Sequence, residues 1–373
     1  MKPVDPSVIH RILVIRTDRL GDLLLNVPAV RALKQRFPGA HLTMLVQPHL
    51  TETVSGNPDV DAVMPYDKGG VERGWWRMLG LVRRLRRERF DLVAILNPSK
   101  RSNIIVFLAG IPVRLGYDRK WGCLLTHRFP DLKHRGEKHE VEYNLDLVRV
   151  VGAMTDDTRL FMPCGPEDEA WVGRWLDGRG GLSDEPLVAV HPGTSSRSKR
   201  WPLERFIAVV DRLEELGVRV VLIGGAEETA GATELMAQAR AMPISAIGAL
   251  TLRQLAALLR RCTALISNDS GPVHVAAAVG TPTVVVFGRT LPGVSARRWG
   301  PWGDGHTVVQ HDVGCVTCDP DRCPIEYQCL LSVSPDEVIE AVLRILQGQG
   351  ARGKGQEKTG SLPRGAWHHL EKG

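Results

Sequence analysis

The fold of this chain is signalled most clearly by residues 265–278, whose sequence is LISNDSGPVHVAAA. An apolar run ends in an Asn-Asp-Ser-Gly segment, and an alanine-rich helical pattern begins at once. This order predicts a buried strand, a tight loop and the first turn of a helix. The first turn leaves backbone N–H groups unpaired and carries partial positive charge, so it is suited to phosphate. An ordinary helix capped by Asp269 or Ser270 is the alternative.

Runs of the same kind alternate with amphipathic stretches along most of the chain. Continuous Val, Ile and Leu runs are typical of parallel strands that are covered on both faces. Strands are predicted at residues 12–15, 42–46, 62–64, 92–96, 187–190, 218–223, 264–267 and 283–287, and helices at 27–37, 203–216, 226–239 and 252–259. The alternation predicts an α/β fold with doubly wound parallel sheets.

The pattern falls into two blocks, separated by a stretch near 164–181 that is rich in glycine and charge. We expect a first domain at residues 1–165 and a second at 182–348. The polar segment 349–373 is expected to be a flexible tail. Two such domains would leave a ligand cleft at the carboxyl ends of their strands.

Composition narrows the classes of function. The 373 residues carry a net charge of +6 with 43% hydrophobic residues, which fits a globular protein with anionic ligands. We find no nucleic-acid-binding motif, no signal peptide and no apolar run long enough to span a membrane. The expected location is therefore the cytoplasm, where the seven cysteines would be reduced, metal-bound or catalytic.

The loop after the first strand contains Asp18 and Asp22. Either could cap the next helix, and Asp22 could alternatively serve as a carboxylate that accepts a proton. Neither a G-x-G-x-x-G fingerprint nor a P-loop motif occurs, so a dehydrogenase or a P-loop nucleotidase is not expected.

Two loops in the second block contain groups that suit a nucleotide. The segment 191–202, HPGTSSRSKRWP, offers Thr194 and Ser195 as hydroxyl donors and Lys199 as a cation for phosphate. A solvated basic loop is the alternative. In Gly224-Gly225-Ala226-Glu227 the glutamate could hold ribose hydroxyls or simply begin a helix.

In this order and context, these loops resemble glycosyltransferase family 9, the lipopolysaccharide heptosyltransferases. The resemblance covers roughly residues 10–345 and implies a GT-B fold, in which two Rossmann-like domains face a central cleft. It implies inverting transfer of heptose from ADP-heptose to the lipid A-linked inner core of lipopolysaccharide. The first domain would bind the acceptor and the second the nucleotide sugar, with no cofactor.

The resemblance also implies roles for individual residues. Asp22 would be the general base and Lys199 the catalytic cation, with Arg19 and Arg101 expected on the acceptor side. The donor would be held by Thr194, Ser195, Glu227, Asn268, Asp269, Ser270, Gly271 and His274. A fixed lysine, hydroxyls and a helix terminus could stabilise the leaving diphosphate without a metal.

Four cysteines lie within fifteen residues, at Cys315, Cys318, Cys323 and Cys329. Their spacing makes them a candidate structural metal site, and a reduced or partly disulfide-linked loop is the alternative.

Residues 75–89 predict a basic helix with an apolar stripe at positions 75, 78/79, 82 and 85. With other cations of the first domain, its arginines suggest peripheral contact with the inner membrane at its cytoplasmic face. A solvated helix face is the alternative. Three other functions stay open: the same fold with another nucleotide sugar, a GT-B-fold epimerase, or an inactive binding protein.

Overall fold

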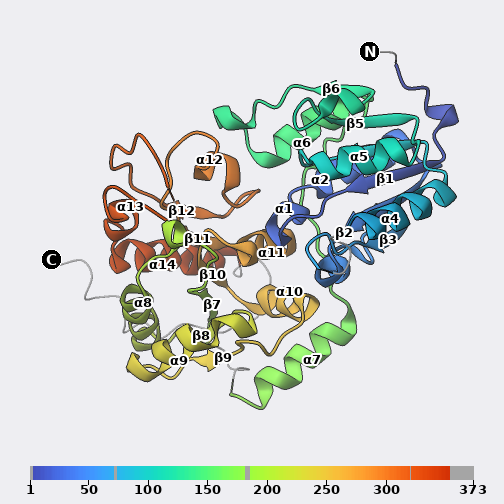
Figure 1. Ribbon diagram of the computed structural model, residues 1–373. Helices are drawn as coiled ribbons and strands as arrows, with labels where there is room; N and C mark the ends of the chain where they lie inside the picture. Colours follow the sequence, from blue (N-terminus) through green and yellow to red (C-terminus); the bar gives the residue numbers. More distant parts are fainter. Residues whose placement is uncertain (1–2, 71–73, 181–184, 320, 353–373) are drawn as a thin grey trace. The chain divides into compact units, whose positions relative to one another are not determined.

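The computed structural model describes residues 3–70, 74–180, 185–319 and 321–352 (Figure 1). These form two compact units. The first draws on residues 1–164, 277–279 and 291–303, and the second on residues 165–276, 280–290 and 304–373.

The first unit is built on a six-stranded parallel sheet with the order β3-β2-β1-β4-β5-β6. Its strands are β1 (Arg11–Ile15), β2 (His41–Val46), β3 (Ala62–Pro65), β4 (Leu92–Ile95), β5 (Val113–Tyr117) and β6 (His127–Phe129). Its helices include α1 (Leu20–Leu24), α2 (Val27–Arg36), α3 (Thr51–Val54), α4 (Trp75–Glu88), α5 (Lys100–Leu108), α6 (Glu140–Arg149) and α12 (Ala296–Trp299).

The second unit repeats this plan with a parallel sheet of order β12-β11-β10-β7-β8-β9. Its strands are β7 (Leu187–His191), β8 (Arg219–Leu222), β9 (Ile244–Ser245), β10 (Ala264–Asn268), β11 (Thr283–Val286) and β12 (Thr307–Val309). Its helices include α7 (Pro166–Asp177), α8 (Leu203–Glu215), α9 (Thr229–Gln238), α10 (Leu252–Arg261), α13 (Gln328–Leu331) and α14 (Pro335–Arg352), and α11 (Gly271–Val279) begins in it.

The strand order of each sheet reverses at one point, and these two points locate the candidate sites. In the first unit the chain leaves β1 in one direction and returns to its other side at β4. In the second unit the same reversal lies between β7 and β10. Ligands of doubly wound sheets bind beyond the carboxyl ends of the strands at such a switch point. The loops after β1, β4, β7 and β10 are therefore the ones to inspect.

Each of the eight strands expected from the sequence is present, and this confirms the α/β class with parallel sheets. Their apolar runs are covered on both faces, since Ile12 to Ile15 of β1 are at most 1% exposed. The helix expected at 226–239 is split into a short 3-10 turn (Ala226–Glu228) followed by α9. Helix α14 continues to Arg352, into the segment expected to be a tail, and residues 353–373 lie outside the described part.

The apolar stripe expected on α4 needs one correction. The helix buries Met78, Leu81, Val82 and Leu85, whereas Trp75 is 60% exposed. Trp75 is the first residue of α4, so the buried face begins one turn later and Leu81 belongs to it. Within the described residues, no helix combines the length and apolar character that crossing a bilayer requires.

Candidate active site

Asp22 lies beyond the carboxyl end of β1, where a buried arginine holds its carboxylate. Arg16 Nη2 donates to Asp22 Oδ1 at 2.7 Å, and Arg16 Nη1 donates to the carbonyl oxygen of Leu96, just after β4, at 2.8 Å. The side chain of Arg16 is 3% exposed, whereas that of Asp22 retains 19%. A carboxylate that is fixed in orientation yet reachable from solvent is suited to accept a proton from a bound hydroxyl.

Neither aspartate of this loop caps α1. The N-cap residue is Arg19, without a side-chain capping bond, and Asp22 sits in the first turn of the helix. Asp18 is instead held by Asn97 Nδ2 at 2.9 Å and by Lys68 Nζ at 3.2 Å. The capping interpretation is therefore wrong for α1. Arg16 of the same loop orients Asp22, and side chains that follow β3 and β4 orient Asp18.

Arg16 is itself part of a buried ionic cluster. Glu140 of α6 is 1% exposed and accepts from Lys133 Nζ at 2.5 Å and from Arg298 Nη2 at 2.9 Å, with Arg16 Nη1 3.6 Å away. Burial would raise the pKa of Glu140, but the three cations, Lys133 foremost, lower it to about 2. Burial lowers the pKa of Lys133 to about 8. This cluster fixes the guanidinium that orients Asp22.

The two residues expected on the acceptor side lie beyond the same end of the sheet as Asp22, at the carboxyl ends of its strands. Arg19 directly follows the loop after β1 and is exposed, and Arg101 lies in the first turn of α5, after β4. Arg101 Nε donates to Tyr66 Oη at 2.5 Å. Because β1 and β4 are parallel neighbours, their carboxyl ends bring these side chains to one region of the first unit.

In the second unit, the loop 192–201 after β7 is fixed at both ends by Asn268. Asn268 Nδ2 donates to the carbonyl oxygen of Pro192 at 2.7 Å, and Asn268 Oδ1 accepts from the backbone N–H of Trp201 at 3.0 Å. Asn268 is fully buried. Both side-chain polar atoms of Asn268 therefore hold the loop in place.

A cation cluster lies beyond β10 and β11. The carboxylate oxygen Asp269 Oδ2 is 2.7 Å from Lys199 Nζ and 3.0 Å from Arg289 Nη2. Asp269 is 7% exposed, and Arg289 Nε is buried without a hydrogen-bond partner in the described part of the chain. Two cations share one carboxylate, so the cluster keeps a net positive charge that suits a diphosphate.

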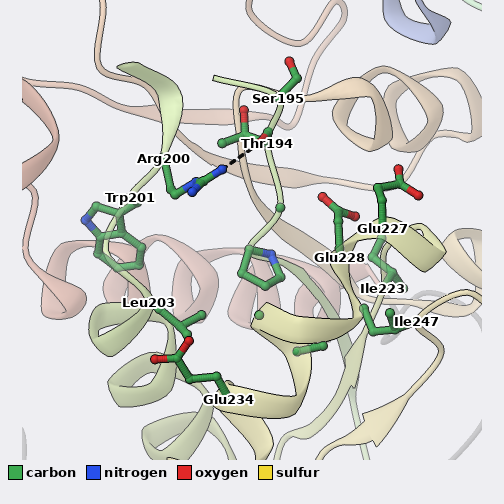
Figure 2. Close-up of a pocket in the computed structure, with 14 residues that line it drawn as sticks. Thr194, Ser195, Arg200, Trp201, Leu203, Ile223, Glu227, Glu228, Glu234 and Ile247 are labelled. Atoms are coloured by element: carbon green, nitrogen blue, oxygen red, sulfur yellow. Dashed lines mark hydrogen bonds between the residues drawn. The ribbon is translucent and has the colours of Figure 1, made fainter. Parts of the chain in front are cut away.

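A cavity of about 450 Å³ opens beside the loop 192–201 (Figure 2). It is lined by Pro192, Gly193, Thr194, Ser195, Arg200, Trp201, Leu203, Ile223, Glu227, Glu228, Gly231, Ala232, Glu234 and Ile247. Thr194 Oγ1 is buried and has no partner among the described residues. The mixture of apolar wall, carboxylates and an unused hydroxyl is typical of a pocket for a small polar ligand. Lys199 and Asp269 are not part of the lining.

Glu227 lines the cavity as expected, but Glu228 makes the closer contacts with the protein. Glu228 Oε2 is 3.1 Å from His191 Nε2 and accepts from the backbone N–H of Gly225 at 2.9 Å. Burial, the largest single effect, would raise the pKa of Glu228, but the hydrogen bond and charge of His191, the backbone N–H of Gly225 and the charge of Arg200 together lower it. A Cβ on Gly193 would lie 1.4 Å from Glu228 Oε1, so a larger residue there would have to displace the Glu228 carboxylate.

The first turn of α11 begins at Gly271, and the side chain of Ser270 just before it contacts the same histidine. Ser270 Oγ lies 3.0 Å from His191 Nδ1 and 2.9 Å from Ser267 Oγ. His274 is also in α11 and is 5% exposed. His191 therefore links the cavity, through Glu228, to the start of α11.

Among the described residues, the four clustered cysteines are not arranged as a metal site. Cys315, Cys318, Cys323 and Cys329 are all free thiols, and the described residues contain no group of three His, Cys, Asp or Glu side chains arranged to hold a metal. Burial, followed by the neighbouring thiols, raises the pKa of Cys329 to about 11.

Three residues of these sites were not found from the sequence: Arg16, Glu228 and Arg289. Glu228 directly follows Glu227 in the loop after β8, and Arg289 follows the apolar run of β11. A search for charged residues in the loops after predicted strands would have found both. Arg16 gave no signal of its own, because a buried arginine after a strand is recognised only once its carboxylate partners are placed.

Comparisons with known proteins identify the family of the chain. A family model described as glycosyltransferase family 9 (heptosyltransferase) matches residues 78–328, well over half of the chain. The chain is 28% identical over 359 residues to lipopolysaccharide heptosyltransferase 2 of Salmonella typhimurium, covering 91% of this chain and 99% of the relative.

Two solved structures share the fold. A family 9 glycosyltransferase from Veillonella parvula superposes with a TM-score of 0.82 at 25% identity, over 93% of this chain and 99% of the other. The Escherichia coli ADP-heptose lipopolysaccharide heptosyltransferase II gives a TM-score of 0.75 at 24% identity, over 91% and 99%. The GT-B class expected from the sequence is thereby confirmed. The chain is a glycosyltransferase enzyme and belongs to glycosyltransferase family 9, the heptosyltransferases.

Proposed function

We propose that this protein is an inverting, metal-independent heptosyltransferase that moves heptose from ADP-heptose to the lipid A-linked inner core of lipopolysaccharide. The observation that carries the proposal is the cation cluster of Lys199, Asp269 and Arg289 at the switch point of the second sheet. Relatives named as lipopolysaccharide heptosyltransferases support the choice of donor and acceptor.

The second unit binds the nucleotide sugar in this proposal. The cavity beside Thr194 and Glu227 takes the nucleoside, and the diphosphate lies against Lys199 and Arg289. Support comes from two buried donors that have no partner among the described residues, Thr194 Oγ1 and Arg289 Nε. A buried donor without an acceptor costs about 1–3 kcal/mol, which a bound phosphate or ribose oxygen would recover.

The first unit binds the acceptor and supplies the base. The acceptor hydroxyl attacks the anomeric carbon of heptose, its proton passes to the Asp22 carboxylate, and the bond to ADP breaks with the electron pair leaving on the phosphate. One such displacement inverts the anomeric configuration. Arg16 orients the Asp22 carboxylate, and Arg19 and Arg101 attract the anionic acceptor.

Lys199 and Arg289 replace a metal in this proposal, since two fixed cations can stabilise the charge that develops on the leaving diphosphate. Turnover should therefore be unchanged after the protein is treated with EDTA. Loss of turnover that Mg²⁺ restores would contradict this point. Because the acceptor is a glycolipid, we place the enzyme in peripheral contact with the cytoplasmic face of the inner membrane.

The direct test follows ADP release from purified protein given ADP-heptose and a truncated glycolipid that carries 3-deoxy-octulosonate. Release should need both substrates and be lost in Asp22→Asn. Release with a UDP- or GDP-sugar but not with ADP-heptose would show that the donor is wrong. Nucleotide binding without release from any donor would favour a binding protein.

A further inference from the structure

Helix α4 carries two indole side chains on its surface that the core of the first unit does not use. Trp76 is 81% exposed and Trp75 is 60% exposed. The helix packs into the core through Met78, Leu81, Val82 and Leu85. At about 3.6 residues per turn, Trp76, Arg83 and Arg87 share a stripe on the opposite side of the helix. We call these three residues the α4 outer stripe.

The charges around this stripe are almost all positive. Helix α4 contains five arginines and one acidic residue, Glu88, and Glu88 is already paired with Arg11 at 2.5 Å. Within the described part of the chain, Arg77, Arg83, Arg84 and Arg87 form no ion pair. Arg86 Nε is directed to the carbonyl oxygen of Leu108 on the neighbouring segment. The outer stripe therefore presents an exposed indole among cations that form no ion pair with the described residues.

We propose that the α4 outer stripe docks on an anionic phospholipid surface, with Trp76 at the level of the headgroups and Arg83 and Arg87 on lipid phosphates. Indole rings favour the membrane–water interface because they join an apolar body to one N–H donor. Guanidinium groups bind phosphate bidentately, and basic residues are attracted to anionic leaflets. The helix keeps its core contacts and does not insert. This inference rests on the proposed function, because a glycolipid acceptor lies in such a surface.

The chemistry favours a bilayer over an acidic protein. A protein partner would bury the indole in a shaped pocket, whereas a lipid surface accepts a solitary Trp beside a row of cations without complementary shape. The arginines follow one another along the helix at 83 and 87, one turn apart, so both can reach the same plane.

The test is sedimentation of the full chain with vesicles of phosphatidylethanolamine and phosphatidylglycerol, and with vesicles of phosphatidylcholine alone. We expect binding to the first only, weakening as salt rises. Trp76→Ser should lower the partition coefficient about tenfold. The double variant Arg83→Gln/Arg87→Gln should lower it about thirtyfold, roughly fivefold per arginine. Matched controls are Trp121→Ser, at another exposed indole, and Arg212→Gln/Arg240→Gln, which removes the same charge elsewhere.

Heptosyl transfer to a deacylated, water-soluble acceptor separates this inference from the proposed function. Both stripe variants should transfer to that acceptor at the wild-type rate, while losing rate on acceptor embedded in anionic vesicles. Equal binding to both vesicle types, or equal effects of stripe and control variants, would overturn the docking surface and leave the enzyme assignment intact. Vesicle binding that depends on the stripe, with no transfer to either acceptor, would support docking and refute the proposed function. Binding of the full chain through the α4 outer stripe to an acidic protein, but not to vesicles, would also overturn the docking surface.

Discussion

Lys199 Nζ lies 2.7 Å from Asp269 Oδ2, so the aspartate fixes the position of a cation rather than offering its own charge to a ligand. The same oxygen takes Arg289 Nη2 at 3.0 Å. A carboxylate by itself would repel a diphosphate. Here it holds two cations beside each other in a largely buried site. The positive charge of this site comes from the pair of cations, and Asp269 is their support.

Arg289→Gln should weaken ADP binding about 10- to 100-fold, because a hydrogen bond to a charged group contributes about 1.5–3 kcal/mol. Binding of adenosine, which has no phosphate, should be unchanged. Calorimetric titration with both ligands checks this, with Arg212→Gln as a control at an exposed site. An equal loss of affinity for adenosine would mean that Arg289 supports the fold and not the diphosphate.

Asp22→Asn should lower turnover by about 10²- to 10⁴-fold, since general-base catalysis contributes that much. ADP affinity should be nearly unchanged, because the nucleotide is assigned to the second unit. Stopped assays of ADP release, with titration of ADP, measure both quantities. Asp18→Asn is the matched control, as Asp18 is held by Lys68 and Asn97 in the same loop. The base assignment fails if ADP affinity falls as steeply as turnover.

Gly193→Ala should displace Glu228, because the new Cβ would lie 1.4 Å from Glu228 Oε1. We expect weaker nucleotide binding and a loss of about 1–3 kcal/mol in unfolding free energy, which is usual for overpacking. The double variant Gly193→Ala/Glu228→Ala should recover the stability, since the clash is gone.

The control for this pair is Gly231→Ala, in the same cavity wall, where an added Cβ meets nothing within 4 Å. Urea denaturation of the four proteins gives the unfolding free energies. If the double variant is no more stable than Gly193→Ala, the packing of Glu228 against Gly193 is not the cause.

Glu140→Gln should destabilise the protein by about 3–5 kcal/mol at pH 7, because it leaves buried cations without their counter-charge. The folded-state pKa of Glu140 is about 2, against 4.5 for the ordinary group, so its stabilisation is full above pH 4.5 and is lost as the pH falls toward 2. Urea denaturation at several pH values should show a shallower acid slope in the variant.

Glu142→Gln, two residues away and exposed, should cost far less, since Glu142 only caps α6 by accepting from the backbone N–H of His139. Similar losses in the two variants would refute the role given to the buried cluster.

The sheets could be predicted where a strand is a continuous apolar run, as at β1 and β10. Strand β5 was missed because Arg114 and Gly116 interrupt its pattern, although Leu115 and Tyr117 are buried. A Cβ on Gly116 would lie 2.9 Å from Leu125 Cδ1, so a larger residue there would require Leu125 to move. Local pattern cannot show such a contact between distant segments.

The candidate site could be predicted as a set of loops but not as a set of contacts. Asp22, Lys199 and Asp269 follow strands and were found by position. Arg289 is 20 residues from Asp269 along the chain, and only the parallel pairing of β10 with β11 brings the two together. Trp75 was placed in the core because its spacing fits the stripe, and spacing alone does not tell where a buried face begins.

The contacts of His191 decide whether the Ser270 hydroxyl can donate its hydrogen to a ligand. Glu228 is ionised and can only accept, so His191 Nε2 carries hydrogen and, in the neutral ring, Nδ1 is an acceptor. Ser267 Oγ donates to the carbonyl oxygen of Asn268, so the single hydroxyl hydrogen of Ser270 goes to His191 or to Ser267. With a neutral imidazole, Ser270 therefore shows a ligand only its lone pairs.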